Sequence, residues 1–537
     1  MISSLAWIRK GAAKEFPEKY NLSDQEFDRI AGDIGIQVAA AKEELQAAEA
    51  AAKRAIAEDE AAESDDQNEV ADKINQDDDG DDDEEGEDLV VEDKEGEDPL
   101  AKYNLDDYDR DDEEERARKD IPLFGNIRGL TYYASNEEDP YIQMKEDDEE
   151  EEERAEMQVL PTDNLLIAAK TEDEISHLEI YLFEEEEDNL YVHHDIMLPS
   201  FPLCIEWLDF HIGRNKDREG AGNYVAVGTF DPEIEIWNLD VVDTMYPEII
   251  LGSQKHQDKK AKRSRKPNPE RHVDAVMSLS WNPHHRNLIC SGSADHTVKL
   301  WDMNSPERAV KSYDHHKNKV QSVVWNPVEA TVLATGGYDK RVCCFDSRSP
   351  QVISEFKLTA DVECLKWDPF HPERFFVSTE DGIVKCYDAR SPKDSLFTVH
   401  AHDGAVSALD VSRIVDGLLV TGSTDKTVKL WNIKDNKPSC ICSRDVGVGK
   451  VFAANFSVDS AMVLAVSGAK GKVVVWNLTD NAGVRSAFRG QVNIPASTKP
   501  RKEFATVEDE EDEEPDEEEG EEMEDGDGDE GGMDVDA

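Results

Sequence analysis

The strongest constraint in this sequence is a pair of residue series, mostly aromatic, that keep a fixed phase with one another. One series ends a short strand-like run in each unit: Tyr181, Trp237, Trp301, Phe345, Tyr387, Trp431 and Trp476. After Trp301 its steps are 44, 42, 44 and 45 residues. The second series is Trp207, Trp281, Trp325, Trp367, Asp410 and Phe456. From Trp281 on, its members lie 20 residues upstream of the first series, or 21 at Asp410. Two series in phase indicate a chain of repeated units.

Each unit predicts several short strands separated by turns. The unit that ends at Trp301 reads "VMSLSWNP", then "NLICSGS", then "HTVKLWDM", with Asn-Pro and Ala-Asp as turn signals. A repeat of about 40 to 45 residues with this strand content is typical of a β-propeller blade. One blade cannot bury both of its faces, so blades stack radially until the ring closes. We therefore expect an all-β fold, a single seven-bladed propeller over residues 121–500, closed by a strand from 126–134 or 484–490.

Polar residues recur at equivalent positions of three units. They are His272, Asp295 and Trp301 in the third unit, His316 and Asp339 in the fourth, where Phe345 replaces tryptophan, and His402, Asp425 and Trp431 in the sixth. At these residues the chain resembles the WD-repeat family. The resemblance implies a buried hydrogen-bonded chain of histidine, serine or threonine (here Ser291), aspartate and tryptophan, which fixes a turn. A catalytic His–Asp dyad is the alternative, but recurrence in three units favours the structural role.

The charge of the chain is concentrated outside the repeats. The chain has 122 acidic and 59 basic residues and a net charge of −63, of which residues 58–158 carry −34 and residues 508–537 carry −20. The acid runs hold too few large apolar residues to offset the entropy of ordering. We expect a disordered linker at 58–120, a disordered acidic loop at 145–156 and a disordered tail at 501–537. Such a tail either shields basic partners or only solvates the chain.

Residues 1–57 are predicted to form a partly helical arm. Ser23 and Glu26 fit a helix capping box, and "VAAAKEELQAAEAAAKRAIA" is rich in strong helix formers. The apolar positions of that stretch are mostly alanine, so the helix buries little by itself. An exposed helix is one interpretation. The other, which we favour, is an arm that binds a partner through Trp7, Ile8, Phe16, Tyr20, Phe27 and Ile30.

The spacing from Trp237 to Trp301 exceeds the period by about 20 residues because of a basic insertion at 253–272. Six basic residues of this insertion lie within eight consecutive positions: Lys259, Lys260, Lys262, Arg263, Arg265 and Lys266. Such a cluster serves as a nuclear import signal or as an arm that neutralises RNA phosphates. A solvated loop is the alternative, which the concentration of charge disfavours.

Several classes of function lack their signals in this sequence. No run of about 18 apolar residues occurs, and the N-terminus has no signal-peptide core. The eight cysteines form no Cys-x-x-Cys pair, as expected in a reducing compartment. Ser423 stands where a phosphate-binding loop would have its lysine, and no nucleophile elbow or metalloprotease motif is present. We expect a soluble intracellular protein without enzyme activity, cofactor, metal, small-molecule substrate or membrane contact.

Three stretches carry a more specific resemblance: "AWIRKGAAKEFPEKYNLSDQEFDRI", "YYASNEEDPYI" and "HLEIYLFEEEEDNLYVHHDIMLPSFPLCIEWLDF". Together with the paired tryptophans of the later units, they resemble the periodic tryptophan protein 1 family of WD-repeat proteins. The resemblance implies a nucleolar scaffold for large ribosomal subunit assembly and pre-rRNA processing. The expected partners are ribosome assembly factors, ribosomal proteins and pre-rRNA, with the chain monomeric inside a larger particle. A chromatin adaptor that binds histones and regulates ribosomal gene transcription is the alternative.

Overall fold

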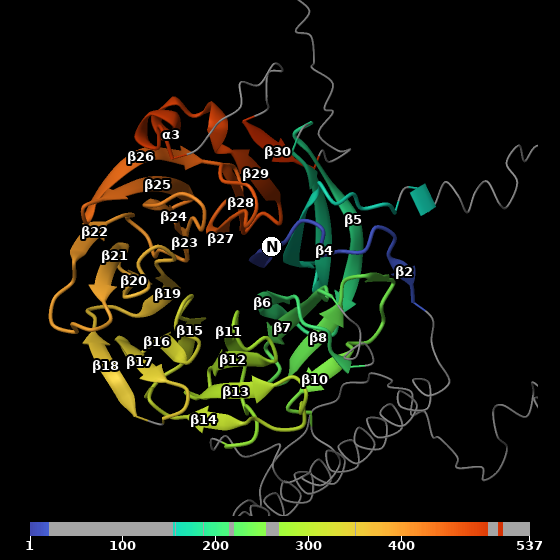
Figure 1. Ribbon diagram of the computed structural model, residues 1–537, viewed down its shortest axis with the longest axis horizontal. Helices are drawn as coiled ribbons and strands as arrows, with labels where there is room; N and C mark the ends of the chain where they lie inside the picture. Colours follow the sequence, from blue (N-terminus) through green and yellow to red (C-terminus); the bar gives the residue numbers. More distant parts are fainter. Residues whose placement is uncertain are drawn as a thin grey trace, which may run out of the picture. The chain divides into compact units, whose positions relative to one another are not determined.

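The computed structural model describes residues 1–20, 154–155, 157–185, 187–213, 220–253, 268–349, 351–491 and 503–507. Within these residues, seven four-stranded antiparallel sheets form the blades of a ring (Figure 1). The innermost strands pack in the cyclic order β1, β6, β11, β15, β19, β23, β27 and back to β1. This closed order confirms the predicted seven-bladed propeller. Closure leaves no blade with an uncovered face, which is the physical reason for the repeat.

The strands of each blade follow one another from the centre of the ring outward. The first blade consists of β1 (Ile2–Ile8), β3 (Asn164–Glu172), β4 (Ile175–Glu184) and β5 (Asn189–Leu198). The second consists of β6 (Pro202–Leu208), β7 (Tyr224–Thr229), β8 (Ile234–Asn238) and β10 (Ile249–Leu251). The third consists of β11 (Val276–Trp281), β12 (Leu288–Ser293), β13 (Val298–Asp302) and β14 (Lys311–Tyr313).

The later blades repeat this arrangement. The fourth consists of β15 (Val320–Trp325), β16 (Val332–Gly337), β17 (Arg341–Asp346) and β18 (Val352–Lys357). The fifth consists of β19 (Val362–Trp367), β20 (Arg374–Thr379), β21 (Ile383–Asp388) and β22 (Phe397–His400). The sixth consists of β23 (Ala408–Val411), β24 (Leu418–Gly422), β25 (Thr427–Lys434) and β26 (Lys437–Asp445). The seventh consists of β27 (Val451–Phe456), β28 (Val463–Gly468), β29 (Val473–Asn477) and β30 (Phe504–Thr506).

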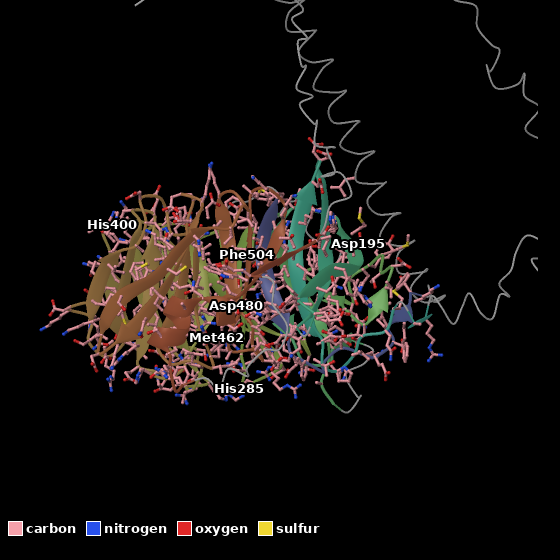
Figure 2. All side chains as sticks on the ribbon, turned by 90° about the horizontal axis from the view of Figure 1, so that it is seen from above. Asp195, His285, His400, Met462, Asp480 and Phe504 are labelled. Atoms are coloured by element: carbon pink, nitrogen blue, oxygen red, sulfur yellow. The ribbon has the colours of Figure 1, made fainter. Side chains whose placement is uncertain are left out.

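The ring has two faces, which are seen edge-on in Figure 2. The lower face carries the loops between the first and second strands of each blade, where the picture places His285 and Met462. The upper face carries the loops between the second and third strands and the connections between blades, such as the one that follows His400. We keep these two names below.

The N-terminal segment is part of the ring, which differs from the predicted partner-binding arm. Ile2–Ile8 forms the innermost strand of the first blade and pairs antiparallel with β3, with Trp7 opposite Leu166. The side chains of Ile2, Leu5 and Trp7 are buried. They pack between the first and seventh blades. Burial between the two sheets removes these apolar side chains from water, which stabilises the fold.

In the structure the first and seventh blades are completed by β1 and β30, and neither strand comes from the two predicted closing segments. Residues 126–134 lie outside the described residues, and 484–490 include part of α3 (Ala482–Ala487), whose Val484 packs against the seventh blade. The outermost strand of the seventh blade is β30, which lies within the segment expected to be a disordered tail. The described strands of the propeller therefore begin before and end after the predicted range of 121–500, with β1 at one end and β30 at the other.

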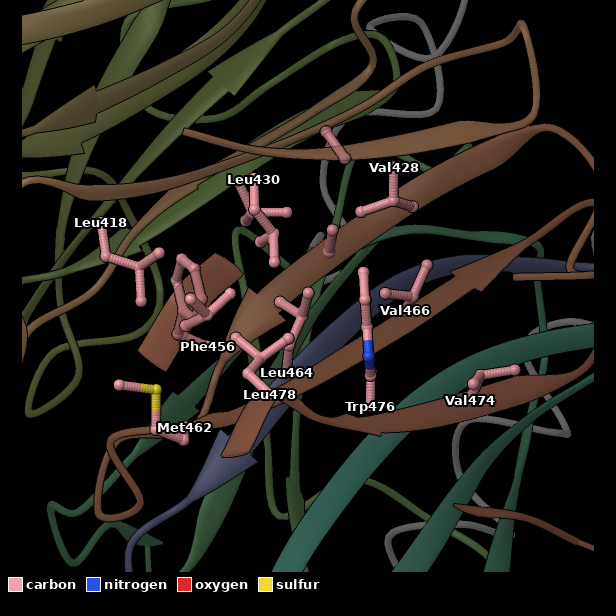
Figure 3. Packing of buried hydrophobic residues seen from close by; sticks show 14 of the residues in the cluster. Leu418, Val428, Leu430, Phe456, Met462, Leu464, Val466, Val474, Trp476 and Leu478 are labelled. Carbon is pink, nitrogen blue, oxygen red and sulfur yellow. The ribbon is translucent and has the colours of Figure 1, made fainter. Parts of the chain in front are cut away.

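The hydrophobic core lies between neighbouring blades. The close-up in Figure 3 shows Leu418, Val428 and Leu430 of the sixth blade facing Phe456, Leu464 and Trp476 of the seventh. Fully burying one such aliphatic or aromatic side chain contributes about 1.5–3 kcal/mol. Each blade is therefore stabilised mainly by the two blades beside it.

A short parallel pair links the N-terminal segment to the second blade. β2 (Glu18–Lys19) pairs with β9 (Val241–Val242).

Among the described residues, no helix is long and apolar enough to span a membrane. All eight cysteines are free thiols, and Cys440 is the exposed one.

Candidate protein-interaction surface

The predicted His–Asp residues form buried hydrogen-bonded chains. In the third blade, the indole N–H of Trp301 donates to Ser291 Oγ at 2.8 Å, and Ser291 Oγ lies 2.6 Å from His272 Nε2. His272 Nδ1 lies 2.9 Å from Asp295 Oδ2. Asp295 Oδ1 in turn accepts the backbone N–H of Thr297, which fixes the turn between β12 and β13.

The sixth blade repeats the whole chain and the fourth repeats part of it. Trp431 donates to Thr421, Thr421 Oγ1 lies 2.8 Å from His402 Nε2, and His402 Nδ1 lies 3.0 Å from Asp425. In the fourth blade His316 bridges Thr335 and Asp339 at 2.9 and 3.0 Å. Phe345 has no indole N–H, so the chain of hydrogen bonds ends at the threonine there.

The electrostatics of the third blade suit a structural role. Burial lowers the pKa of His272, which keeps the imidazole neutral. Burial alone would raise the pKa of Asp295, but hydrogen bonds from His272 and Thr297 hold that pKa well below its usual range. The side chains of His272, His316 and His402 are fully buried, so substrate cannot reach them. These pairs fix turns and offer no reaction site.

Four blades lack this hydroxyl, and in the fifth Val377 occupies its place beside Tyr387. In the second blade Val227 occupies the place of Ser291, and Trp237 donates to Glu235 Oε2 at 3.1 Å instead. In the first blade Tyr181 donates in the same way to Glu179. In the seventh blade Val466 occupies the place of Ser291, and the buried Trp476 Nε1 has no hydrogen-bond partner. In the first and second blades, the sequence signal for this alternative acceptor is a glutamate two residues before the aromatic residue.

Two tryptophans of the upstream series donate hydrogen bonds to a neighbouring blade. Trp325 Nε1 donates to Ser280 O at 3.1 Å and Trp367 Nε1 to Val324 O at 3.3 Å, each across a blade boundary. Trp7 Nε1 donates to Asn455 O at 2.9 Å and so belongs to the same series. Leu5-Ala6-Trp7 also ends its strand as Ile205-Glu206-Trp207 does, which is the sequence signal for β1.

The sixth-blade member of this series is Val411 rather than the predicted Asp410. Val411 pairs with Leu419, which pairs with Trp431, as Trp281 pairs through Ile289 with Trp301. Asp410 instead accepts the backbone N–H of Phe456 in the next blade at 2.9 Å. Its other carboxylate oxygen lies 3.3 Å from Lys366 Nζ. The carboxylate therefore satisfies an inner-edge N–H group, which explains the polar residue at this position.

The residues of the predicted arm have separate locations. Trp7 and Ile8 are buried in the ring. Phe16 lies under the guanidinium of Arg154, 4.6 Å from its ring centroid, and the backbone N–H of Tyr20 donates to Val242 O. Phe27 and Ile30 lie outside the described residues. Four of the six residues thus contact the propeller's own chain.

The six predicted basic residues, Lys259, Lys260, Lys262, Arg263, Arg265 and Lys266, also lie outside the described residues. The C-terminal end of their insertion is held by Lys299. The ammonium of this fully buried lysine donates to Asn268 O at 2.6 Å and to Ser312 Oγ at 2.7 Å. Burial lowers the pKa of Lys299 to about 8. The point at which the insertion joins the third blade is therefore fixed.

A repeated side-chain turn shapes the lower face. Asn326 Oδ1 accepts the backbone N–H groups of Val328 and Glu329 at 2.9 and 2.8 Å. The corresponding acceptors in other blades are Asn282, Asp368, Ser412 and Ser457. Asn326 Nδ2 also donates to Pro372 O in the fifth blade, so neighbouring loops are tied together. The residue two positions after each acceptor is held in a defined place.

In three adjacent blades this residue is apolar and exposed. Val328, Phe370 and Ile414 are 57, 39 and 41% exposed. We call these three residues the lower-face apolar arc. Exposed apolar residues on rigid, adjacent loops are typical of a protein-binding surface. Within the described ranges, by contrast, no group of three or more histidine, cysteine, aspartate or glutamate side chains is placed to bind a metal ion.

The sequence comparisons agree with this architecture. The family model "WD domain, G-beta repeat" matches residues 266–302, 307–346 and 393–432. The fold and the matched repeats define the chain as a WD-repeat β-propeller protein.

Two relatives cover nearly the whole chain. An uncharacterised WD repeat-containing protein of Schizosaccharomyces pombe is 47% identical over 93% of both chains. Periodic tryptophan protein 1 of Saccharomyces cerevisiae is 33% identical over 93% of this chain and 92% of its own. A shorter match, 26% identical over 38% of this chain and 47% of the relative, is a Caenorhabditis briggsae protein named ribosome biogenesis protein WDR12 homolog. The chain belongs to the periodic tryptophan protein 1 family.

Proposed function

We propose that this protein is a non-catalytic scaffold in ribosome biogenesis. It acts in assembly of the large ribosomal subunit and in pre-rRNA processing, within the nucleolus. Its partners are ribosome assembly factors and ribosomal proteins, and pre-rRNA belongs to the same particle.

The observation that carries this proposal is the lower-face apolar arc. Val328, Phe370 and Ile414 lie on loops fixed by side-chain turns, so little conformational entropy is lost when a partner binds them. The His–Asp chains are buried inside the blades, which leaves the loops of the two faces and the outermost strands as the accessible parts of each repeat. A stiff ring with a preformed apolar surface suits a role in binding other proteins better than a role in catalysis.

Family membership and the name of one partial relative support the ribosomal assignment. The WDR12 homologue matches part of this chain, and its name places that protein in ribosome biogenesis. Under this proposal the basic insertion contacts pre-rRNA or an import receptor, and the salt dependence of RNA binding would report on its phosphate contacts.

Affinity purification of the tagged full chain tests the proposal. The variant carries Phe370→Ser and Ile414→Ser, and the matched control carries Ile353→Ser, an exposed apolar residue on the outer strand β18. We expect the wild type and the control to recover large-subunit ribosomal proteins with pre-rRNA, and the arc variant to recover much less of both. Depletion of the protein is expected to raise the level of large-subunit rRNA precursors. Recovery of histones in place of ribosomal proteins, with unchanged precursors, would support the chromatin alternative instead.

A further inference from the structure

A second apolar surface lies on the upper face of the first two blades. A groove of about 550 Å³ runs between the turn that joins β3 to β4 and the connection from β5 to β6. Leu198, Pro199 and Phe201 line one side, and Ile175 lines the other. The groove is on the opposite face from the lower-face apolar arc.

Two large apolar side chains at this groove are exposed. Ile175, at the start of β4, is 53% exposed and lines the groove directly. Phe230, in the turn between β7 and β8, is 59% exposed, and its ring centroid lies 5.4 Å from that of Phe201, which lines the groove. Together with the connection from β5 to β6, these two turns place apolar side chains around one groove, which is more than the single exposed residues that any surface carries.

The groove has a fixed shape. Phe230 N–H donates to Phe201 O at 3.2 Å, which holds the second blade's turn against the connection between the blades. Thr171 Oγ1 and Ser176 Oγ lie 3.0 Å apart and close the β3–β4 turn from within. Thr171 N–H also donates to Met1 O, so the innermost strand supports the same wall. A partner would therefore meet a preformed site.

The rim of the groove is acidic. Asp173 and Glu174 form the exposed turn on one side, and exposed Asp231 follows Phe230 directly on the other. The nearby ammonium group of Lys170 is already paired, because its Nζ lies 3.0 Å from a carboxylate oxygen of Glu179. Burial and the neighbouring charges of Asp231 and Glu233 raise the pKa of Glu235 to about 7, in keeping with a negative local potential.

We propose that this groove binds a peptide segment of another protein that carries apolar anchors flanked by lysine or arginine. The apolar side chains of such a segment fill the space beside Ile175, Phe201 and Phe230. Its basic residues face Asp173, Glu174 and Asp231, which steer its approach and would repel a nucleic acid. The inference does not depend on a role in ribosome assembly, because it concerns only the chemistry of the occupant.

Binding of a synthetic peptide to the full chain tests this proposal. The probe is a fluorescein-labelled amphipathic peptide of about 18 leucine and lysine residues, which spans five helical turns. A second peptide replaces each leucine by serine and keeps every lysine, so it measures attraction to the acidic segments alone. The affinity is measured by fluorescence anisotropy for the wild type, the double variant Ile175→Ser with Phe230→Ser, and the control Ile353→Ser.

We expect the leucine peptide to bind the double variant at least about tenfold more weakly than it binds the wild type, a difference of about 1.4 kcal/mol. The control variant binds as the wild type does, and the serine peptide binds all three proteins weakly and equally. Since the substituted side chains are more than half exposed, thermal melting of the variants should match the wild type.

Three results would overturn the proposal. The first is equal affinity of the leucine peptide for all three chains. The second is displacement of the peptide from the wild type by an oligouridylate of similar length, with the double variant showing no such competition. The third uses the chain in which the six basic residues of the insertion are changed to glutamine. If the peptide binds only that chain, the groove's occupant is the protein's own insertion.

Discussion

The indole N–H of Trp7 on β1 donates to the backbone carbonyl of Asn455 on β27 at 2.9 Å, and this hydrogen bond joins the first blade to the seventh. The two residues are 448 positions apart. The bond lies where the ring closes, beside the buried cluster of Ile2, Leu5 and Trp7 with Ala453 and Val475. The stability of the ring therefore depends on the first eight residues of the chain.

Replacing Trp7 by alanine should open this boundary. We expect a loss of about 3–5 kcal/mol in the free energy of unfolding, from the cavity and the lost hydrogen bond. Hydrogen exchange should also rise in β27 and β28, which pack against β1. The control is Trp281→Ala, because the Trp281 indole bonds to Arg286 O within its own blade. Equal exchange in β27 for both variants would contradict the assigned role of Trp7.

Replacing Val466 by threonine should stabilise the seventh blade. Trp476 Nε1 is buried without a partner, and Val466 stands where Thr421 accepts the corresponding indole N–H in the sixth blade. A threonine hydroxyl at 466 would accept that N–H, which contributes about 1 kcal/mol. The measurement is chemical denaturation. The matched control, Val420→Thr, introduces a hydroxyl next to Thr421 with no orphaned indole and should destabilise the protein. A loss of stability in Val466→Thr equal to that of the control would disprove this account.

Replacing Glu235 by glutamine should change the pH dependence of stability. Burial, followed by the charges of Asp231 and Glu233, raises the pKa of Glu235 to about 7 in the folded protein. The folded state then holds a proton that the unfolded state releases above about pH 4.5, so this group stabilises the fold at low pH and loses that contribution as pH rises to 7. Glutamine keeps an acceptor for Trp237 and does not titrate. The stability difference, variant minus wild type, should therefore rise between pH 4.5 and 7. A stability difference that stays flat over this pH range would refute the assignment.

Replacing Asn326 should separate the two roles of its side chain in the lower-face turn. Asn326→Ala removes the acceptor for Val328 and Glu329 and the donor to Pro372, so a loss of about 1–3 kcal/mol is expected. Asn326→Asp keeps the acceptor, as Asp368 does in the fifth blade, and loses only the donor. Its loss should be smaller when both are measured by denaturant unfolding. Equal losses of stability in the two variants would show that the hydrogen bonds accepted by the side chain at 326 contribute nothing to stability.

Several features of the fold could be read from the sequence because each blade solves the same local packing problem. The alternation and the paired aromatic positions are local, so the seven blades and the three histidine–aspartate pairs were predictable. The register of the sixth blade was less predictable from the sequence. Asp410 lies one position from the expected phase, and only the pairing of Val411 with Leu419 shows which residue faces the core.

The residues of the candidate surfaces were not predictable, for a physical reason. Val328, Phe370 and Ile414 are spaced like ordinary loop residues, and their adjacency depends on how neighbouring blades are tied together. Ile175 and Phe230 come from two blades and carry no shared motif. Exposure is a property of the assembled ring and cannot be assigned to a single residue in a sequence.

By itself, the sequence determined the repeating unit, because a strand's alternation and the polar partners of a buried indole are set by neighbours within about 45 residues. Only the tertiary structure decided how the ring closes. Trp7 has the same pattern as the other inner-strand tryptophans, but its partners lie on β3 and β27, far along the chain. Loop closure over such a distance costs entropy that only the combined burial of two blade faces can offset, and no local pattern records that balance.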